Sequence, residues 1–305
     1  MENIMEFFVP SLNDIREIKE AFKNNEKRCC EMSPANAVLW AKRTNTEITF
    51  WEDNIIFRSL FEGNKHSYAC NLLNTPDAKR LFDKIVDLAK ESNEILFMHC
   101  LVEEEVDMIE NWYPGKYQFD FNRNDSDYIY TREKMATLAG KKLHGKRNHI
   151  HRFEEQNPDW NYETITDENE EECAQMAMQW CVRNCMDEKN EIEFAKIDES
   201  KLVVYAIRHR DEFGMIGGAL RAGGKIIAVT LGERVTDDTF VVHFEKAFPE
   251  IQGAYPMINR EFVRHELSSY TYVNREEDLG MEGLRKAKLS YRPEFLLNKA
   301  LLSEK

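Results

Sequence analysis

The stretch Gly218–Glu233, GALRAGGKIIAVTLGE, has the pattern of a β-hairpin. Two runs of apolar and β-branched residues flank Gly223-Gly224, and a Gly-Gly pair in this position is typical of a two-residue hairpin turn. The run DTFVVHFEKAF at Asp238–Phe248 predicts a third strand, and YPMINREFVRHEL at Tyr255–Leu267 has apolar residues at helical spacing. This part of the chain is therefore predicted to fold as a hairpin, a strand and a helix.

The same order of elements occurs nearer the start of the chain. EITFWEDNIIFRSLF predicts a hairpin around Asp53-Asn54, HSYACNLL a third strand, and TPDAKRLFDKIVDLAKE a helix. A further strand closes each set, EILFMHCL in the first half and SYTYVNRE in the second, and an aromatic and proline-marked element follows each. The pattern recurs after about 170–175 residues, which indicates duplication of a whole domain.

The duplication predicts a mixed α+β protein of two tandem units, each a mixed sheet flanked by helices. A length of 305 residues suits two domains. The acidic stretch around Pro158 separates the two patterns, so we expect an N-terminal unit at residues 1–157 and a C-terminal unit at residues 158–305. The basic segment Gly140–Phe153, GKKLHGKRNHIHRF, is expected to be a linker helix that ends the first unit.

The formal net charge of −14 argues against a protein whose whole surface binds nucleic acid or anionic lipid, because such binding needs a broad basic face. Contact with an anion must therefore be local. The two candidates are the basic segment and the stretch Arg285–Arg292, neither of which contains an acidic residue. The alternative for each is a solvated helix face.

Neither secretion nor membrane insertion is predicted. The N-terminal residues are acidic where a signal peptide is basic, and no apolar run reaches about 20 residues, so we expect a cytoplasmic protein without a transmembrane segment. Seven cysteines without framework spacing fit a reducing compartment. Cys173, Cys181 and Cys185 could be metal ligands, but no CxxC pair or nearby histidine supports this. We expect buried helix cysteines and no metal.

The order hairpin, strand, helix, strand, helix resembles the core of GNAT-type acyltransferases. In that fold the turn after the third strand holds the pyrophosphate of acyl-CoA on backbone N–H groups at the start of a helix. The resemblance implies that Gln252, Gly253, Ala254 and the following Tyr255 bind the donor here. The corresponding turn of the first half, CNLLNTPDAKR, has no glycine, so only the second unit is expected to bind a donor. The alternative is a plain strand-to-helix turn.

Most of the chain, and most specifically its last third, resembles the tandem-GNAT family that includes the C-terminal domain of bacterial phosphatidylglycerol lysyltransferases and has stand-alone members. The matching residues, besides the basic segment and the stretch VHFEKAFPEIQGAYPMIN, are Gly283, Leu284, Arg285, Lys288, Tyr291 and Pro293. The resemblance implies aminoacyl transfer, and the more distant Fem peptidyltransferases use aminoacyl-tRNA. The lysyltransferases carry membrane-spanning segments ahead of this domain and this chain has none, which leaves the acceptor open.

Charges of both signs meet at the strand-to-helix junction Val273–Leu297. In acyl transfer negative charge develops on a carbonyl oxygen while the attacking amine or hydroxyl loses a proton, so a site needs a cation and a base. The predicted cations, for this charge or for a donor phosphate, are Lys288, Arg275, Arg285 and Arg292. The predicted bases or ammonium partners are Glu245, Glu276 and Asp278. The alternative is that these charges pair with one another on the surface.

Two expectations concern placement. The basic segment should line the groove between the units and contact a donor such as tRNA or a nucleotide phosphate through Lys146 and Arg147. On a helix that starts near Gly280, Lys288 should project into a cleft between the units, near Arg275 and the Gln252 turn. His243 fits a core position as well as a catalytic one.

The leading interpretation is an acyltransferase that moves an aminoacyl or acetyl group from aminoacyl-tRNA or acyl-CoA, with a catalytic second unit, a degenerate first unit and no permanently bound cofactor. The alternative is a non-catalytic binding module for an anionic ligand or protein partner. The chain lacks a Walker loop, a dinucleotide Gly-x-Gly-x-x-Gly, a nucleophile elbow and His-Glu-x-x-His. N–H groups of the Gln252 turn that point into an open cleft next to Lys288 would favour the enzyme, and a helix N-terminus plugged by Tyr255 or Phe248 would favour the binding module.

Overall fold

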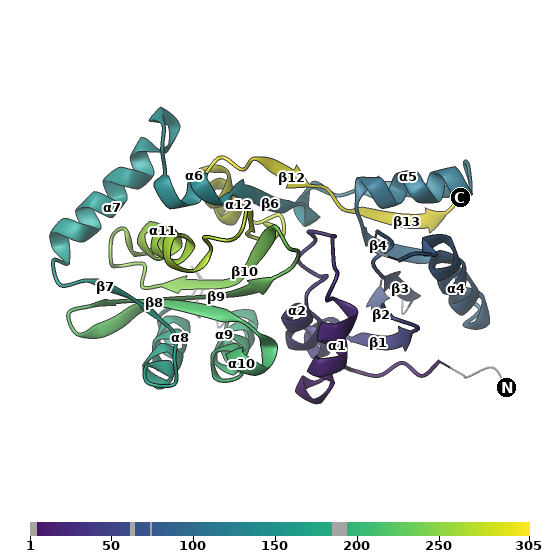
Figure 1. Ribbon diagram of the computed structural model, residues 1–305, viewed down its shortest axis with the longest axis horizontal. Helices are drawn as coiled ribbons and strands as arrows, with labels where there is room; N and C mark the ends of the chain where they lie inside the picture. Colours follow the sequence, from purple (N-terminus) through teal and green to yellow (C-terminus); the bar gives the residue numbers. More distant parts are fainter. Residues whose placement is uncertain (1–4, 62–64, 74, 185–193) are drawn as a thin grey trace.

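The computed structural model describes residues 5–61, 65–73, 75–184 and 194–305. It is a mixed α+β protein with two mixed sheets, each flanked by helices, which confirms the predicted fold class (Figure 1). Within the described ranges, no helix combines the length and apolarity needed to cross a membrane.

The first sheet has the strand order β1-β2-β3-β4-β13-β5. Its strands are β1 (Thr46–Trp51), β2 (Asn54–Phe61), β3 (Lys65–Ala69), β4 (Phe97–Leu101), β13 (Ala300–Glu304) and β5 (Tyr117–Phe121). Only β3 and β4 pair in parallel among these neighbours. Trp51 pairs with Asn54, so the first hairpin turn is Glu52-Asp53, one residue earlier than predicted.

The second sheet has the strand order β12-β6-β11-β10-β9-β8-β7. Its strands are β12 (Phe295–Leu297), β6 (Asp127–Thr131), β11 (Tyr272–Asn274), β10 (Thr239–Ala247), β9 (Lys225–Arg234), β8 (Ile216–Ala222) and β7 (Asn161–Thr164). Here β10 and β11 form the parallel pair. The hairpin turn is Gly223-Gly224 as predicted, and both residues have positive φ, 58° and 72°, which glycine adopts without strain.

Each sheet contains one strand from the other half of the chain. β6 pairs with β11 and β12 in the second sheet, and β13 pairs with β4 and β5 in the first. Figure 1 shows the yellow strand β13 beside β4. With this exchange, both sheets contain the same succession of a hairpin, a third strand, a parallel strand and two antiparallel strands, and the second sheet has β7 in addition. β6 thus lies with the C-terminal unit although it precedes Pro158, and β13 lies with the N-terminal unit.

Helices cover the faces of both sheets. Those that precede β7 are α1 (Ile15–Ala21), α2 (Pro34–Leu39), α3 (Ala41–Thr44), α4 (Ala78–Glu91), α5 (Glu103–Trp112), α6 (Arg132–Thr137) and α7 (His144–Gln156). Those that follow it are α8 (Glu170–Asn184), α9 (Phe194–Arg208), α10 (Arg210–Phe213), α11 (Ala254–Glu266) and α12 (Glu282–Leu289). α11 packs on one face of the second sheet and α8 and α9 lie on the other (Figure 1).

The larger apolar core extends across both halves. Ile48 and Phe57 of the first sheet belong to the same buried cluster as Phe240 and Phe244 of the second. A separate core lies between the first sheet and α4, around Phe82. The segment between α1 and α2 also joins the halves, since Asn25 Nδ2 donates to the carbonyl of Val235 at 2.7 Å and Asn274 Nδ2 donates to that of Arg28 at 2.8 Å. The two units are therefore packed as one body.

Candidate active site

The parallel strands β10 and β11 separate after a short paired stretch. They pair over Thr239–Val241, and β10 then continues to Ala247. Glu245 lies on this continuing part of β10, and Arg275 directly follows the end of β11. The register of β10 with β9 also shifts between Val242 and Phe244, and such bulges often occur next to active sites because they redirect side chains. Polar side chains therefore meet where the two strands diverge.

Five side chains from five segments meet here, and we call them the Arg275 cluster: Lys146 of α7, Glu245 of β10, Asn259 of α11, Arg275 after β11 and Tyr291 after α12. Arg275 Nη2 donates to Glu245 Oε1 at 2.9 Å, and Asn259 Nδ2 donates to Glu245 Oε2 at 2.8 Å. The guanidinium carbon of Arg275 lies 5.0 Å from the centre of the Tyr291 ring. Both oxygens of the Glu245 carboxylate are thus held by side chains.

Two atoms of the Arg275 cluster have no hydrogen-bond partner among the described residues. Arg275 Nη1, a donor, and Asn259 Oδ1, an acceptor, are both buried and have no partner at hydrogen-bonding geometry, although the Tyr291 hydroxyl also interacts with the Arg275 guanidinium. Buried polar atoms are nearly always paired, because an unpaired one costs about 1–3 kcal/mol. Each belongs to a side chain whose other end holds Glu245, so neither can turn away without breaking that bond. These two atoms suit a ligand that offers a hydrogen-bond acceptor to Arg275 Nη1 and a hydrogen-bond donor to Asn259 Oδ1.

Lys146 gives this cluster a titratable amine. Its Nζ lies 4.0 Å from the centre of the Tyr291 ring. Burial lowers the pKa of Lys146, and the positive charge of Arg275 lowers it further, to about 8, although Glu245 opposes this. A lysine with this pKa is partly neutral near pH 7, so its amine can take up a proton.

His243 forms a second buried set with two carboxylates. Its Nδ1 lies 2.7 Å from Glu276 Oε1 and its Nε2 lies 3.0 Å from Glu233 Oε1. Burial alone would lower the pKa of His243, but the bonds to the two carboxylates raise it to about 10. Glu233 Oε1 also accepts from the backbone N–H of Ala35 at the start of α2, at 2.9 Å. His243 is therefore a charged side chain that ties the junction to the N-terminal half, and Glu276 is engaged with it.

Asp278 and Arg285 face each other. Arg285 Nε and Nη2 each lie 2.8 Å from a different oxygen of Asp278, and the hydroxyl of Tyr128 donates to the same carboxylate. The bonds from Arg285 and Tyr128 hold the pKa of Asp278 below its usual range, although burial opposes this. The two residues, predicted as base and donor contact, are thus joined in a pair that fixes the loop before α12.

Lys288 does not project into an open cleft, contrary to the prediction. It is 8% exposed, and its Nζ donates to the backbone carbonyl of Arg275 at 2.6 Å and to that of Glu277. Burial lowers its pKa. The predicted closeness to Arg275 is confirmed, but the ammonium group binds the backbone of the loop that carries Arg275 and Glu276.

Replacing Lys288 with alanine should therefore destabilise the fold. It leaves two carbonyls without their charged donor, and we expect a loss of about 2–3 kcal/mol in the free energy of unfolding, measured in urea. Lys286→Ala, at an exposed position of the same helix, is the control and should change stability by no more than about 0.5 kcal/mol. An equally small effect at Lys288 would show that its two bonds contribute nothing.

The remaining predicted residues lie in different surroundings. Arg147 donates to the carbonyls of Leu138 and Gly140, so it stabilises the preceding turn while its neighbour Lys146 reaches the Arg275 cluster. Arg292 is exposed and lines a surface hollow of about 450 Å³ together with Arg285 and Lys286. Cys173 and Cys181 are buried on α8, whereas Cys185 lies outside the described residues.

The Gln252 turn is covered by α7. Gly253 has φ 87°, and a Cβ at this position would lie 2.3 Å from the carbonyl oxygen of His149. Tyr255 accepts a hydrogen bond from Trp180 Nε1 at 3.1 Å. The predicted plug, Tyr255 or Phe248, is thus not what meets Gly253. The linker helix packs directly on it.

Sequence reasoning missed Asn259, Glu233 and the role of Tyr291. Asn259 had a usable signal, since it lies four residues after Tyr255 and four before Val263, on the apolar face of a predicted helix, and a buried amide there needs a polar partner. Glu233 had no such signal, because its two partners come from β10 and from the start of α2. Tyr291 was named only because it matches the family ending. In the structure it is 5% exposed, and its ring lies against Arg275.

The chain is similar to several known proteins in sequence and in fold. A family model described as phosphatidylglycerol lysyltransferase, C-terminal, matches residues 22–301. A solved structure of a conserved protein of unknown function from Bacteroides thetaiotaomicron is 35% identical, with a TM-score of 0.87, over 99% of this chain and 100% of that one. L-PGS from Bacillus licheniformis is 15% identical, with a TM-score of 0.66, over 100% and 94%. An uncharacterized protein from Mycoplasmoides gallisepticum is 23% identical over 232 residues, 72% of this chain and 70% of its own.

Proposed function

Since the chain belongs to the phosphatidylglycerol lysyltransferase C-terminal family, we propose that it is an acyltransferase whose second unit works at the Arg275 cluster. It moves an aminoacyl or acetyl group from an activated donor to an amine or hydroxyl acceptor. The observation that carries the proposal is the pair of unpartnered buried atoms, Arg275 Nη1 and Asn259 Oδ1, beside the titratable Lys146. Acyl transfer requires a hydrogen-bond donor, a hydrogen-bond acceptor and a base in one place.

The proposed chemistry assigns each group one task. The acceptor amine or hydroxyl attacks the carbonyl carbon of the donor, a new C–N or C–O bond forms, and the ester or thioester bond breaks. Negative charge develops on the carbonyl oxygen, and Arg275 Nη1 stabilises it. Neutral Lys146 takes the proton of the attacking group and returns a proton to the departing oxygen or sulfur. Asn259 Oδ1 accepts a hydrogen bond from the acceptor and orients it.

The position of α7 supports aminoacyl-tRNA over acyl-CoA as the donor. A pyrophosphate bound in the manner of acyl-CoA needs free space at the Gln252 turn, and α7 fills the space next to Gly253. α7 also carries basic side chains of the segment Gly140–Phe153, several of them exposed, which suit the phosphates of a tRNA acceptor end. Lys146, on the same helix, reaches the reaction centre, so one helix would contact both the backbone and the ester of the donor.

The rate of transfer should rise with pH because Lys146 acts in its neutral form. With a pKa of about 8, the neutral fraction rises about eightfold between pH 7 and 8.5, and the rate should rise with it. We expect Lys146→Arg, which stays charged throughout, to lose this rise. The measurement is single-turnover donor consumption across this range, with the uncatalysed loss of donor subtracted. A wild-type profile unchanged by the substitution would exclude Lys146 as the base.

A donor panel tests the proposal. The full chain is mixed with lysyl-tRNA, alanyl-tRNA, uncharged tRNA, acetyl-CoA and longer acyl-CoAs, and its thermal unfolding is followed. A ligand at 100 times its dissociation constant should stabilise the protein by about 2.7 kcal/mol. We expect stabilisation by the aminoacyl-tRNAs that is weaker in Lys146→Ala. Stabilisation by none of these donors would remove the support for transfer and favour a binding module for another anion.

A further inference from the structure

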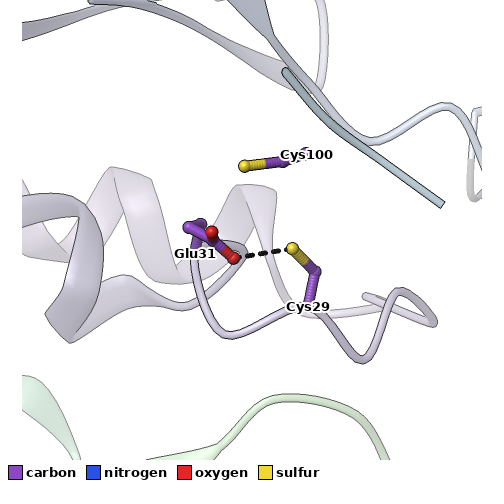
Figure 2. Close-up of side chains that lie close together, drawn as sticks. All are labelled: Cys29, Glu31 and Cys100. Atoms are coloured by element: carbon purple, nitrogen blue, oxygen red, sulfur yellow. Dashed lines mark hydrogen bonds between the residues drawn. The ribbon is translucent and has the colours of Figure 1, made fainter. Parts of the chain in front are cut away.

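Three buried thiols surround one carboxylate at the junction of the two halves. Cys29 and Cys30 lie in the segment between α1 and α2 next to Glu31, and Cys100 lies on β4. Cys29 Sγ lies 2.7 Å from Glu31 Oε2, and Cys30 Sγ lies 3.2 Å from the same oxygen. Figure 2 shows the Cys100 side chain lying across from Glu31 and Cys29. The three cysteines are 0%, 2% and 7% exposed.

Cys29, Glu31 and Cys100 have the spacing of metal ligands. Their two sulfurs and one carboxylate oxygen all lie within 4.8 Å of one another. Around a tetrahedral Zn²⁺ with Zn–S bonds of about 2.3 Å, two sulfurs lie about 3.8 Å apart, so small side-chain movements would complete the geometry. Two thiolates and a carboxylate form a ligand set that favours a thiophilic cation over Mg²⁺ or Ca²⁺.

The backbone at Cys100 adds an independent observation. Cys100 has φ 59°, in the left-handed region that a non-glycine residue rarely adopts in a strand. Such strain persists where the surroundings impose it, and it concentrates at ligand clamps and active sites. Here the strained residue is the one that brings a thiol from the first sheet to the Cys29–Glu31 segment.

Two buried ammonium groups lie beside the site, although each also pairs with another carboxylate, Lys27 with Glu105 and Lys299 with Asp127. Lys299 Nζ donates to Glu31 Oε1 at 2.6 Å and to Asp127 Oδ1 at 2.9 Å, and Lys27 lies on the side of Cys100. Two thiolates and Glu31 around a dication carry one net negative charge, which Lys299 can offset. Lys299 also lies 3.9 Å from Cys30 Sγ and 3.8 Å from Glu277 Oε2. Lys299 therefore lies next to Cys30, and a ligand set with metal spacing is formed by Cys29, Glu31 and Cys100.

We propose that Cys29, Glu31 and Cys100 bind a thiophilic divalent cation of the Zn²⁺ type. Binding forms two metal–thiolate bonds and one metal–carboxylate bond and releases the two thiol protons to solvent. A water molecule completes the fourth position. The metal ties β4 of the first sheet to the segment before α2. That segment also bonds to β6 of the second sheet, because the Cys30 N–H donates to Asp127 Oδ2 at 2.9 Å. The site is distinct from the Arg275 cluster and independent of transfer.

Cobalt uptake tests the metal site. The full chain is reduced, stripped with a chelator and titrated with Co²⁺, and we expect a near-ultraviolet thiolate-to-cobalt absorption band that Zn²⁺ then abolishes. Cys29→Ser and Cys100→Ser should each remove the band, and Glu31→Gln should weaken binding at least tenfold. Cys173→Ser is the matched control, because Cys173 is also a buried free cysteine but lies on α8. It should keep the band.

The pH dependence of uptake gives a second readout. Because two thiol protons leave, the affinity of the wild-type chain should rise by up to a hundredfold per pH unit below the pKa values of the thiols. Absence of a thiolate band in the folded wild-type chain overturns the proposal, as does a band that persists in Cys29→Ser and Cys100→Ser. A disulfide between Cys29 and Cys100, with no cobalt uptake by the reduced chain, overturns it as well.

Discussion

Replacing Arg275 with glutamine is expected to lower the rate of acyl transfer by about 10²–10³-fold. The Arg275 side chain is 13% exposed and bonds Glu245, and its Nη1 is the buried N–H group that we propose binds the carbonyl oxygen of the aminoacyl ester. Loss of one donor to a developing oxyanion typically costs about 3–4 kcal/mol in the barrier. Single-turnover consumption of aminoacyl-tRNA measures the effect directly.

Two further variants separate a catalytic loss from a folding defect. Arg275→Lys keeps the charge but loses the forked geometry, so it should bond Glu245 and still transfer slowly. Arg16→Gln removes an exposed arginine from α1, away from the Arg275 cluster and from α7, and should transfer at the wild-type rate. If Arg275→Gln unfolds at the same urea concentration as the wild type and transfers equally fast, Arg275 does not act on the reacting carbonyl.

Replacing Lys27 with methionine is expected to lower the free energy of unfolding by about 3–5 kcal/mol. Lys27 Nζ lies 2.7 Å from Glu105 Oε2, and both side chains are fully buried. The same ammonium donates to the carbonyl of Cys70 at 3.0 Å. Removing one partner of a buried ion pair leaves the other charge uncompensated, and this is more costly than losing the pair. Urea unfolding measures the loss.

The double variant Lys27→Met, Glu105→Gln tests this explanation. It removes both charges. The N–H groups of Leu72 and Val102 bond different oxygens of Glu105, at 2.9 Å and 3.0 Å, so the single amide oxygen of the glutamine keeps one of these two bonds. We expect the double variant to be more stable than Lys27→Met alone. Lys79→Ala, which breaks a half-exposed pair with Asp83 on α4, should stay within about 0.5 kcal/mol of the wild type. A small loss for Lys27→Met would mean that water reaches Glu105.

The sequence predicted the repeated order of elements but not the exchange of strands. Alternation and turn residues identify hairpins such as Gly218–Glu233 locally, because side-chain period and turn geometry are local properties. β6 and β13 are five-residue strands whose apolar pattern says that they pair, but not with which sheet. Their partners depend on contacts between residues more than 100 positions apart, and a single sequence does not encode these in any local pattern.

The structure brings together some of the predicted site residues but not all of them. Arg275, Glu245 and Lys146 do meet, because strand ends and the linker helix converge where the topology requires. Other predicted charges are bonded within the fold: Asp278 pairs with Arg285, and Arg147 donates to a backbone carbonyl. Charge and helical spacing reveal which residues share a face, but they do not reveal which of them a neighbouring carboxylate or carbonyl will hold. That depends on burial, which only the packed structure shows.

The most direct test of the central claim is single-turnover transfer by the wild-type chain. Lysyl- or alanyl-tRNA is incubated with excess protein and an amine acceptor, and both the loss of the ester and the appearance of the new amide are followed. The account predicts loss of ester well above the uncatalysed rate, with one amide formed per ester lost. Binding of the aminoacyl-tRNA without any acceleration of ester loss would contradict it and would identify the Arg275 cluster as a binding site only.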